Sequence, residues 1–195
     1  MSSPRVLVFA GSARKAALSK RVAQAAHIAL LEAGAQATLI DLADYHAPLY
    51  HGDLEAEQGV PGEITRLLAL IDQHDALLIA TPEYNGSMPP LLVNTLDWIS
   101  RVFAAPGRVA GLEILAQKPV AIVGSSPGAL GGLRSLFHLR DLLGNLGMLV
   151  LPKQLAVGRS HESVTPEGHL VDDHVRAAML GVAQTLVQTT TKLKA

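Results

Sequence analysis

The chain has 195 residues, of which 49% are hydrophobic and only 4% are aromatic, and its formal net charge is −1. This length predicts a single domain spanning residues 1–195, with a core built from Ala, Leu, Val and Ile. The near-neutral charge provides no basic field that would attract nucleic acid. The absence of Cys excludes disulfides, thiolate metal sites and Cys nucleophiles.

The first apolar stretch, residues 6–10, is too short for a signal peptide or a membrane span. We therefore expect a cytoplasmic protein with no membrane partner. Five histidines lie in or beside irregular stretches, and none of them has the spacing of a metal-ligand motif. We predict no metal site. These histidines are His46, His51, His161, His169 and His174.

Short apolar runs alternate along the chain with helical patterns. The runs are apolar throughout and end in small or turn-forming residues, as strands of a parallel sheet covered on both faces do. The alternation predicts a doubly wound α/β sheet with right-handed crossovers. The predicted strands are residues 5–10, 37–40, 76–80, 119–123 and 148–150. The predicted helices are residues 18–33, 64–74, 89–101, 133–146 and 171–192, and residues 44–61 and 158–168 are expected to be irregular.

The loop after the first strand, residues 11–19, opens onto a helix whose free N–H groups and dipole favour an anion. Ser12 and Ser19 can donate hydroxyl hydrogen bonds, and Arg14 can bind a phosphate through two N–H groups at once. The loop matches neither a Walker A sequence nor a G-x-G-x-x-G fingerprint, which argues against a P-loop NTPase and a Rossmann dehydrogenase. The alternative interpretation is that Ser12 caps the helix beside a solvated Arg14.

The loop after the third strand, residues 81–90, lies where open α/β sheets bind their ligands. A flat heteroaromatic ring could lie against Pro82 and Tyr84, while N–H groups near Asn85 and Gly86 meet its polar edge. The alternative is a Pro-initiated turn in which Tyr84 serves only packing. The Gly-rich loop after the fourth strand, residues 124–132, could meet the far edge of the same ring, or could be flexible without a ligand.

Three segments carry a resemblance: GSARKAALS, TPEYNGSMPPLLVNTLDWISR and GSSPGALGGLRSLFHLRDLLGNLGMLVLP. They resemble the NADPH-dependent FMN reductase family, which includes bacterial NAD(P)H:quinone and chromate reductases, and the resemblance covers nearly the whole chain. It implies a flavodoxin-like fold, with a five-stranded parallel sheet of order 2-1-3-4-5 and helices on both faces. It also implies bound FMN, NADPH or NADH as electron donor, and a homodimer or homotetramer.

The resemblance also implies the residues that bind FMN. The phosphate would lie on Ser12, Arg14 and Ser19 at the helix start, the ring along Pro82, Glu83, Tyr84, Asn85 and Gly86, and its far end beside Ser125, Ser126, Pro127 and Gly128. The family's first loop commonly reads G-S-x-R-x-x-S-x-N. Here Ala17 replaces its second Ser and Ser19 replaces its Asn. Because one hydroxyl contact is lost, we expect FMN to be exchangeable.

The implied reaction passes hydride from the nicotinamide to flavin N5 and then to a quinone, FMN, an azo compound or chromate, by a ping-pong mechanism. No side chain is assigned as catalytic, and Glu83 is not assigned as a general acid. One alternative is a flavodoxin-type electron carrier, although such carriers are usually strongly acidic. Another is a homologue that binds no flavin.

Three smaller expectations concern helices. Trp98 and Leu96 lie in the helix after the loop of residues 81–90. We expect them at a subunit interface, with core packing as the alternative. Asp172 and Asp173 are expected in the first turn of the last helix, where the dipole favours acids. His138 is expected to be packed or on the surface.

Overall fold

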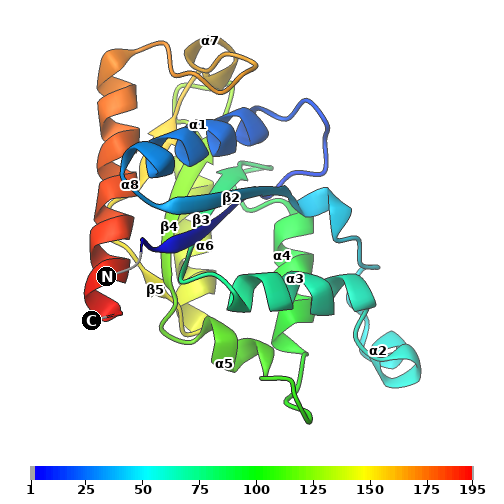
Figure 1. Ribbon diagram of the computed structural model, residues 1–195. Helices are drawn as coiled ribbons and strands as arrows, with labels where there is room; N and C mark the ends of the chain where they lie inside the picture. Colours follow the sequence, from blue (N-terminus) through cyan, green and yellow to red (C-terminus); the bar gives the residue numbers. More distant parts are fainter. Residues whose placement is uncertain (1–2, 195) are drawn as a thin grey trace.

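The computed structural model describes residues 3–194, which form a parallel sheet between two layers of helices (Figure 1). The strand order β2-β1-β3-β4-β5 is the one predicted, and every pairing is parallel. The strands are β1 (Arg5–Ala10), β2 (Gln36–Asp41), β3 (Ala76–Pro82), β4 (Pro119–Ser125), β5 (Leu149–Val150) and β6 (Leu155–Val157).

The edge position beyond β4 holds two short strands, so the sheet has six strands where five were expected. Both β5 and β6 pair with β4, one near its start and the other near its end. Pro152 lies between them. Because Pro has no N–H to donate, the ladder stops there and resumes at Leu155.

Each sheet face is covered by its own group of helices (Figure 1). Helices α1 and α8 cover one face, against Val6 and Val8 of β1, while α3, α4 and α6 cover the other, against Leu7 and Phe9. Both sets of side chains are buried, which explains why the strands are apolar throughout. The helices are α1 (Leu18–Glu32), α2 (Gly52–Gln58), α3 (Gly62–Asp72), α4 (Pro90–Ser100), α5 (Gly111–Leu115), α6 (Leu133–Asn145), α7 (Ser160–Ser163) and α8 (Asp173–Leu193), with a 3-10 turn η1 at Leu42–Asp44.

Two segments expected to be irregular contain short helices. Helix α2 lies within residues 44–61, and none of its residues is buried, so it lacks the apolar periodicity that marks a helix. Helix α7 has only four residues. Helix α8 begins as expected, because the Asp172 carboxylate accepts hydrogen bonds from the N–H groups of His174 and Val175.

The expectation that Trp98 lies at a subunit interface is wrong. Its side chain is completely buried within the chain, and its indole N–H donates to the carbonyl of Pro48 at 2.8 Å. Its ring packs edge-on against Tyr50, with the centroids 5.0 Å apart. Leu96 is also buried, whereas His138 is exposed. Trp98 therefore anchors the segment before α2 to α4. Within residues 3–194, every helix is too short or too polar to traverse a lipid bilayer.

Candidate functional site

The three predicted loops meet at the carboxyl edge of the sheet and frame a cleft of about 110 Å³. The residues lining it come from the ends of β1, β3 and β4 and from the start of α1. They are Ser12, Arg14, Ala17, Leu18, Ser19, Pro82, Glu83, Tyr84, Ser125 and Pro127. Eight of the twelve residues predicted to bind FMN are therefore brought together. Asn85, Gly86, Ser126 and Gly128 lie outside this lining.

The start of α1 offers unpaired donors to the cleft. The N-cap is Ala17, which has no side chain able to cap the first N–H groups. Ser12 is not the cap, because its hydroxyl accepts from the N–H of Arg14 at 3.3 Å, so that alternative interpretation is wrong. The Ser19 hydroxyl is buried and has no partner among the described residues. An uncapped helix start, an unsatisfied hydroxyl and the Arg14 guanidinium together suit a phosphate.

The loop after β3, residues 81–90, is called the ring loop, and it contains a tight hairpin. The N–H of Tyr84 donates to the carbonyl of Ser87, and the N–H of Ser87 donates to the carbonyl of Tyr84, both at 3.0 Å. Asn85 and Gly86 both have positive φ, 52° and 80°, as a two-residue type I′ turn requires. Their N–H groups donate to no other described residue. The turn therefore holds two free donors beside Tyr84, whose side chain is exposed at the cleft.

Glu83 links this loop to α6. Its side chain is only 8% exposed, and it accepts hydrogen bonds from the backbone N–H of Arg134 at 3.2 Å, from Nε of Arg134 at 2.8 Å and from Nη2. The hydrogen bonds and charge of Arg134 hold the pKa of Glu83 below its ordinary value. Glu83 is thus an ionised acceptor that faces the start of α6.

A second contact joins the start of α6 to the end of β3. The Ser135 hydroxyl donates to the carbonyl of Pro82 at 3.0 Å and lies 3.0 Å from the Thr81 hydroxyl. The N-cap of α6, Gly132, provides no side-chain cap, so the carboxylate of Glu83 supplies the negative charge that this helix start favours. The end of β3 is therefore tied to the start of α6 at two points.

The Gly-rich loop is built for packing. The Ser125 hydroxyl donates to the Ser160 hydroxyl at 3.1 Å, and Ser160 in turn accepts from the N–H of Ser126 at 3.2 Å. A Cβ added at Gly131 would lie 2.6 Å from the backbone of β6, and one at Gly132 would lie 3.0 Å from the N atom of Ser125. The hydroxyl of Ser125 is thus occupied within the protein, and the end of the loop at Gly131 and Gly132 packs against β4 and β6.

Sequence reasoning missed the partners that organise these loops. Arg134, Ser135 and Ser160 are not among the predicted site residues. Each lies more than thirty residues from the loop that it supports. The local pattern around them carries no signal of this pairing. Within the described residues, no three His, Asp or Glu side chains converge as metal ligands.

Comparison with known proteins identifies the family. The family model for NADPH-dependent FMN reductases matches residues 4–162. The chain belongs to this family. A quinone reductase of Escherichia coli is 35% identical over 173 residues, which cover 86% of this chain and 85% of that protein. An NAD(P)H-dependent FMN reductase of Pseudomonas aeruginosa is also 35% identical, over 88% of this chain and 87% of its own length.

A solved structure agrees with this assignment. The flavoenzyme FerB of Paracoccus denitrificans, an NAD(P)H:(acceptor) oxidoreductase, superposes with a TM-score of 0.81 at 26% identity, over 97% of this chain and 98% of its own. Membership of the FMN reductase family confirms the predicted flavodoxin-like fold, FMN as cofactor and NAD(P)H as electron donor. The protein is an oxidoreductase.

Proposed function

We propose that this FMN reductase-family protein passes hydride from NADPH or NADH, through FMN in the cleft, to a quinone or a similar small acceptor such as FMN, an azo compound or chromate. The observation that carries the proposal is the buried Ser19 hydroxyl, which has no partner within residues 3–194 and lies at the uncapped start of α1. Relatives named quinone reductase and NAD(P)H-dependent FMN reductase support the choice of donor and acceptor. Bound FMN supplies the hydride chemistry itself.

The chain's own residues bind and orient the cofactor. Ser12, Arg14 and Ser19 hold the phosphate end, where α1 adds its free N–H groups. Because the cleft encloses only about 110 Å³, the ring extends beyond it, over the exposed face of Tyr84. The free N–H groups of Asn85 and Gly86 then bind the polar edge of the ring and stabilise negative charge there.

The remaining predicted residues form the frame of the ring site. Pro82 and Glu83 fix the loop through Ser135 and Arg134. At the far end of the ring, the frame consists of Ser125, Ser126, Pro127 and Gly128. Donor and acceptor use the same open face in turn, which gives ping-pong kinetics. No side chain of the chain has to exchange a proton with either substrate.

A homodimer or homotetramer and a cytoplasmic location stay predictions. Exposed apolar side chains support the prediction of an oligomer: Leu130 is 57% exposed and Phe137 is 56% exposed. Phe137 lies one turn from Arg134 on α6, so a second copy could cover both the helix and the rim of the site.

The test is the visible spectrum of the protein reconstituted with FMN. We expect NADPH to bleach the flavin without oxygen, a quinone to restore the colour, and initial rates to follow a ping-pong pattern. A flavin that binds but stays oxidised would indicate an electron carrier. A protein that stays colourless after addition of FMN would indicate a homologue that binds no flavin.

A further inference from the structure

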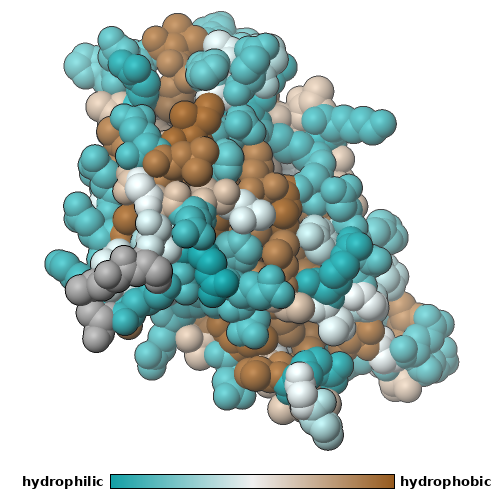
Figure 2. Space-filling model, viewed as in Figure 1, coloured by the Kyte–Doolittle hydropathy of each residue, from teal (hydrophilic) through white to brown (hydrophobic). Residues whose placement is uncertain are grey.

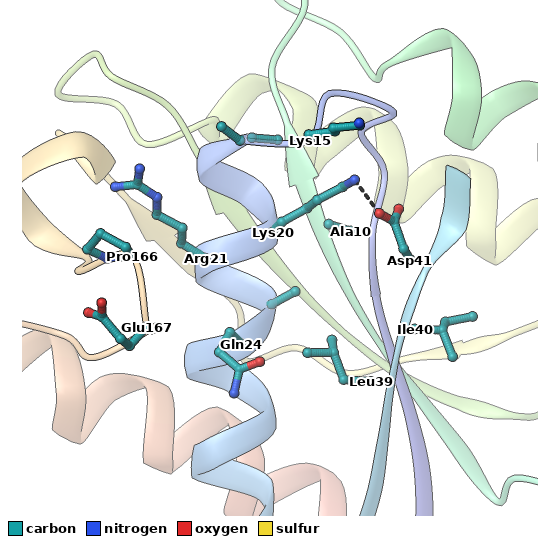
Figure 3. Close-up of a pocket in the computed structure, with 13 residues that line it drawn as sticks. Ala10, Lys15, Lys20, Arg21, Gln24, Leu39, Ile40, Asp41, Pro166 and Glu167 are labelled. Carbon is teal, nitrogen blue, oxygen red and sulfur yellow. Dashed lines mark hydrogen bonds and ion pairs between the residues drawn. The ribbon is translucent and has the colours of Figure 1, made fainter. Parts of the chain in front are cut away.

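The loop between β1 and α1, residues 11–17, is called the phosphate loop. A larger cavity, of about 570 Å³, lies on its other side (Figure 3). Its volume falls within the range of about 300–1,000 Å³ that small-molecule sites occupy. It lies along the first half of α1, with the carboxyl end of β2 on one side of the helix and residues 166–167 on the other. The cavity is lined by Ala10, Lys15, Ala16, Ala17, Lys20, Arg21, Ala23, Gln24, Leu39, Ile40, Asp41, Pro166 and Glu167.

The phosphate loop separates this cavity from the flavin cleft. Arg14 lines the cleft, whereas the next residue, Lys15, lines the cavity. Ala17 is the residue that borders both, and only its methyl group stands where the family pattern has a Ser. Lys15 forms no ion pair with any described residue. The start of α1 thus has a guanidinium on one side and an unpaired ammonium on the other, an arrangement that suits two linked phosphates.

Asp41 adds a second recognition element. It is the last residue of β2 in the unit β1–α1–β2. In Rossmann βαβ units, whose glycine fingerprint this loop lacks, an acid at the corresponding place accepts hydrogen bonds from the adenosine ribose. One oxygen of Asp41 accepts from the N–H of Ala43 at 3.0 Å and the other from Nζ of Lys20 at 2.5 Å. The Asp41 side chain is still 39% exposed, so its carboxylate oxygens keep lone pairs that can accept hydrogen bonds from the two hydroxyls of a ribose.

The rest of the cavity suits a flat base. Ala10, Ala23 and Leu39 provide apolar surface, and the Gln24 amide supplies a donor and an acceptor (Figure 3). Figure 2 shows hydrophobic residues reaching the surface over β2 and beside α1, with hydrophilic residues around them. Apolar surface with a few polar groups is the usual composition of a ligand pocket.

We propose that this cavity is an adenosine subsite and that the chain binds FAD as well as FMN. The flavin half would occupy the cleft, the diphosphate would cross the start of α1 between Arg14 and Lys15, and the ribose would bind Asp41. The inference rests on the proposed flavin site, because the FAD diphosphate reaches Lys15 only if the phosphate next to the flavin lies at Ser19.

The test is equilibrium titration of the apoprotein with FMN and with FAD, followed by flavin fluorescence. We expect FAD to bind about tenfold or more tightly than FMN, since the added contacts include hydrogen bonds to charged groups. Lys15→Met and Asp41→Asn should each remove much of this difference and leave the Kd of FMN within about twofold. Lys192→Met makes the same charge change as Lys15→Met at an exposed position of α8 and should alter neither affinity.

Competition with AMP gives a second readout on the unmodified protein. AMP should raise the apparent Kd of FAD and leave that of FMN unchanged. The inference is overturned if FAD binds no more tightly than FMN, if the difference survives in both variants, or if AMP competes equally with FMN. Failure of FMN itself to bind would instead overturn the proposed function, so the two failures are distinguishable.

Discussion

Glu83 and Arg134, 51 residues apart in the chain, join the ring loop to the first turn of α6. The side chain of Glu83 is nearly buried, while the side chain of Arg134 stays 62% exposed. The pair therefore fixes the position of the loop from one side and presents a cation to solvent on the other. Removing either member should loosen the loop that carries Tyr84, Asn85 and Gly86.

Arg134→Met should lower both the urea midpoint of unfolding and the affinity for FMN, because the Glu83 carboxylate loses its partner while it stays largely shielded from water. We expect Arg134→Lys to retain part of both. Arg176→Met, which breaks an exposed ion pair with Asp173 on α8, is the matched control and should change neither. Wild-type affinity and stability in Arg134→Met would show that the pair does not position the loop.

The pair also predicts a pH dependence. Because Arg134 lowers the pKa of Glu83 in the folded protein, Glu83 contributes stability at pH values above its unfolded pKa, and this contribution is lost as the pH falls through the folded pKa. Unfolding free energies measured across the acidic range should therefore fall less steeply for Glu83→Gln than for the wild type. Parallel curves for the two proteins would contradict the assigned contact.

Ser19→Ala separates a binding role from a structural one. Since the Ser19 hydroxyl has no partner among the described residues, its removal should leave the stability of the apoprotein unchanged or slightly higher. The affinity for FMN should fall about tenfold or more, because a hydrogen bond to a charged group is lost. Calorimetric titration and thermal unfolding measure the two effects. Loss of stability without loss of affinity would remove Ser19 from the phosphate site.

Arg14→Ala should weaken FMN binding more than it lowers turnover at saturating FMN. Arg14 lines the cleft, and its guanidinium donates a single hydrogen bond among the described residues, to the carbonyl of Ala16 at 3.2 Å. Titration with FMN and steady-state rates at saturating FMN test this. Equal FMN affinity before and after the change would exclude Arg14 from the site.

The turn at Asn85 and Gly86 gives a backbone test. Gly86→Ala forces a Cβ into a left-handed conformation, so we expect a loss of about 1 kcal/mol in stability. FMN binding should weaken as well, because the hairpin orients the two free N–H groups. Asn85→Gly keeps the positive φ accessible and serves as the control, with little change in FMN affinity. Urea unfolding and FMN titration of both variants measure these effects.

The sequence by itself determined the main strands of the sheet, most of the helices and the positions of the three predicted ligand-binding loops. These features depend on local causes: apolar runs make buried strands, the periodicity of α1 with Gly34 at its end sets that helix, and the Asn85–Gly86 dipeptide favours its turn. The resemblance of the loop sequences to the FMN reductase family then predicted FMN as the cofactor, and family membership confirmed this prediction.

Only the tertiary structure decided how these loops are held. The contacts of Glu83 with Arg134 and of Ser126 with Ser160 join residues 51 and 34 positions apart, and no local pattern specifies such pairs. The break at Pro152 and the burial of Trp98 likewise depend on which neighbours the fold supplies. The cavity beside Lys15 exists only because α1 packs against β2, which places Asp41 and the phosphate loop on one surface.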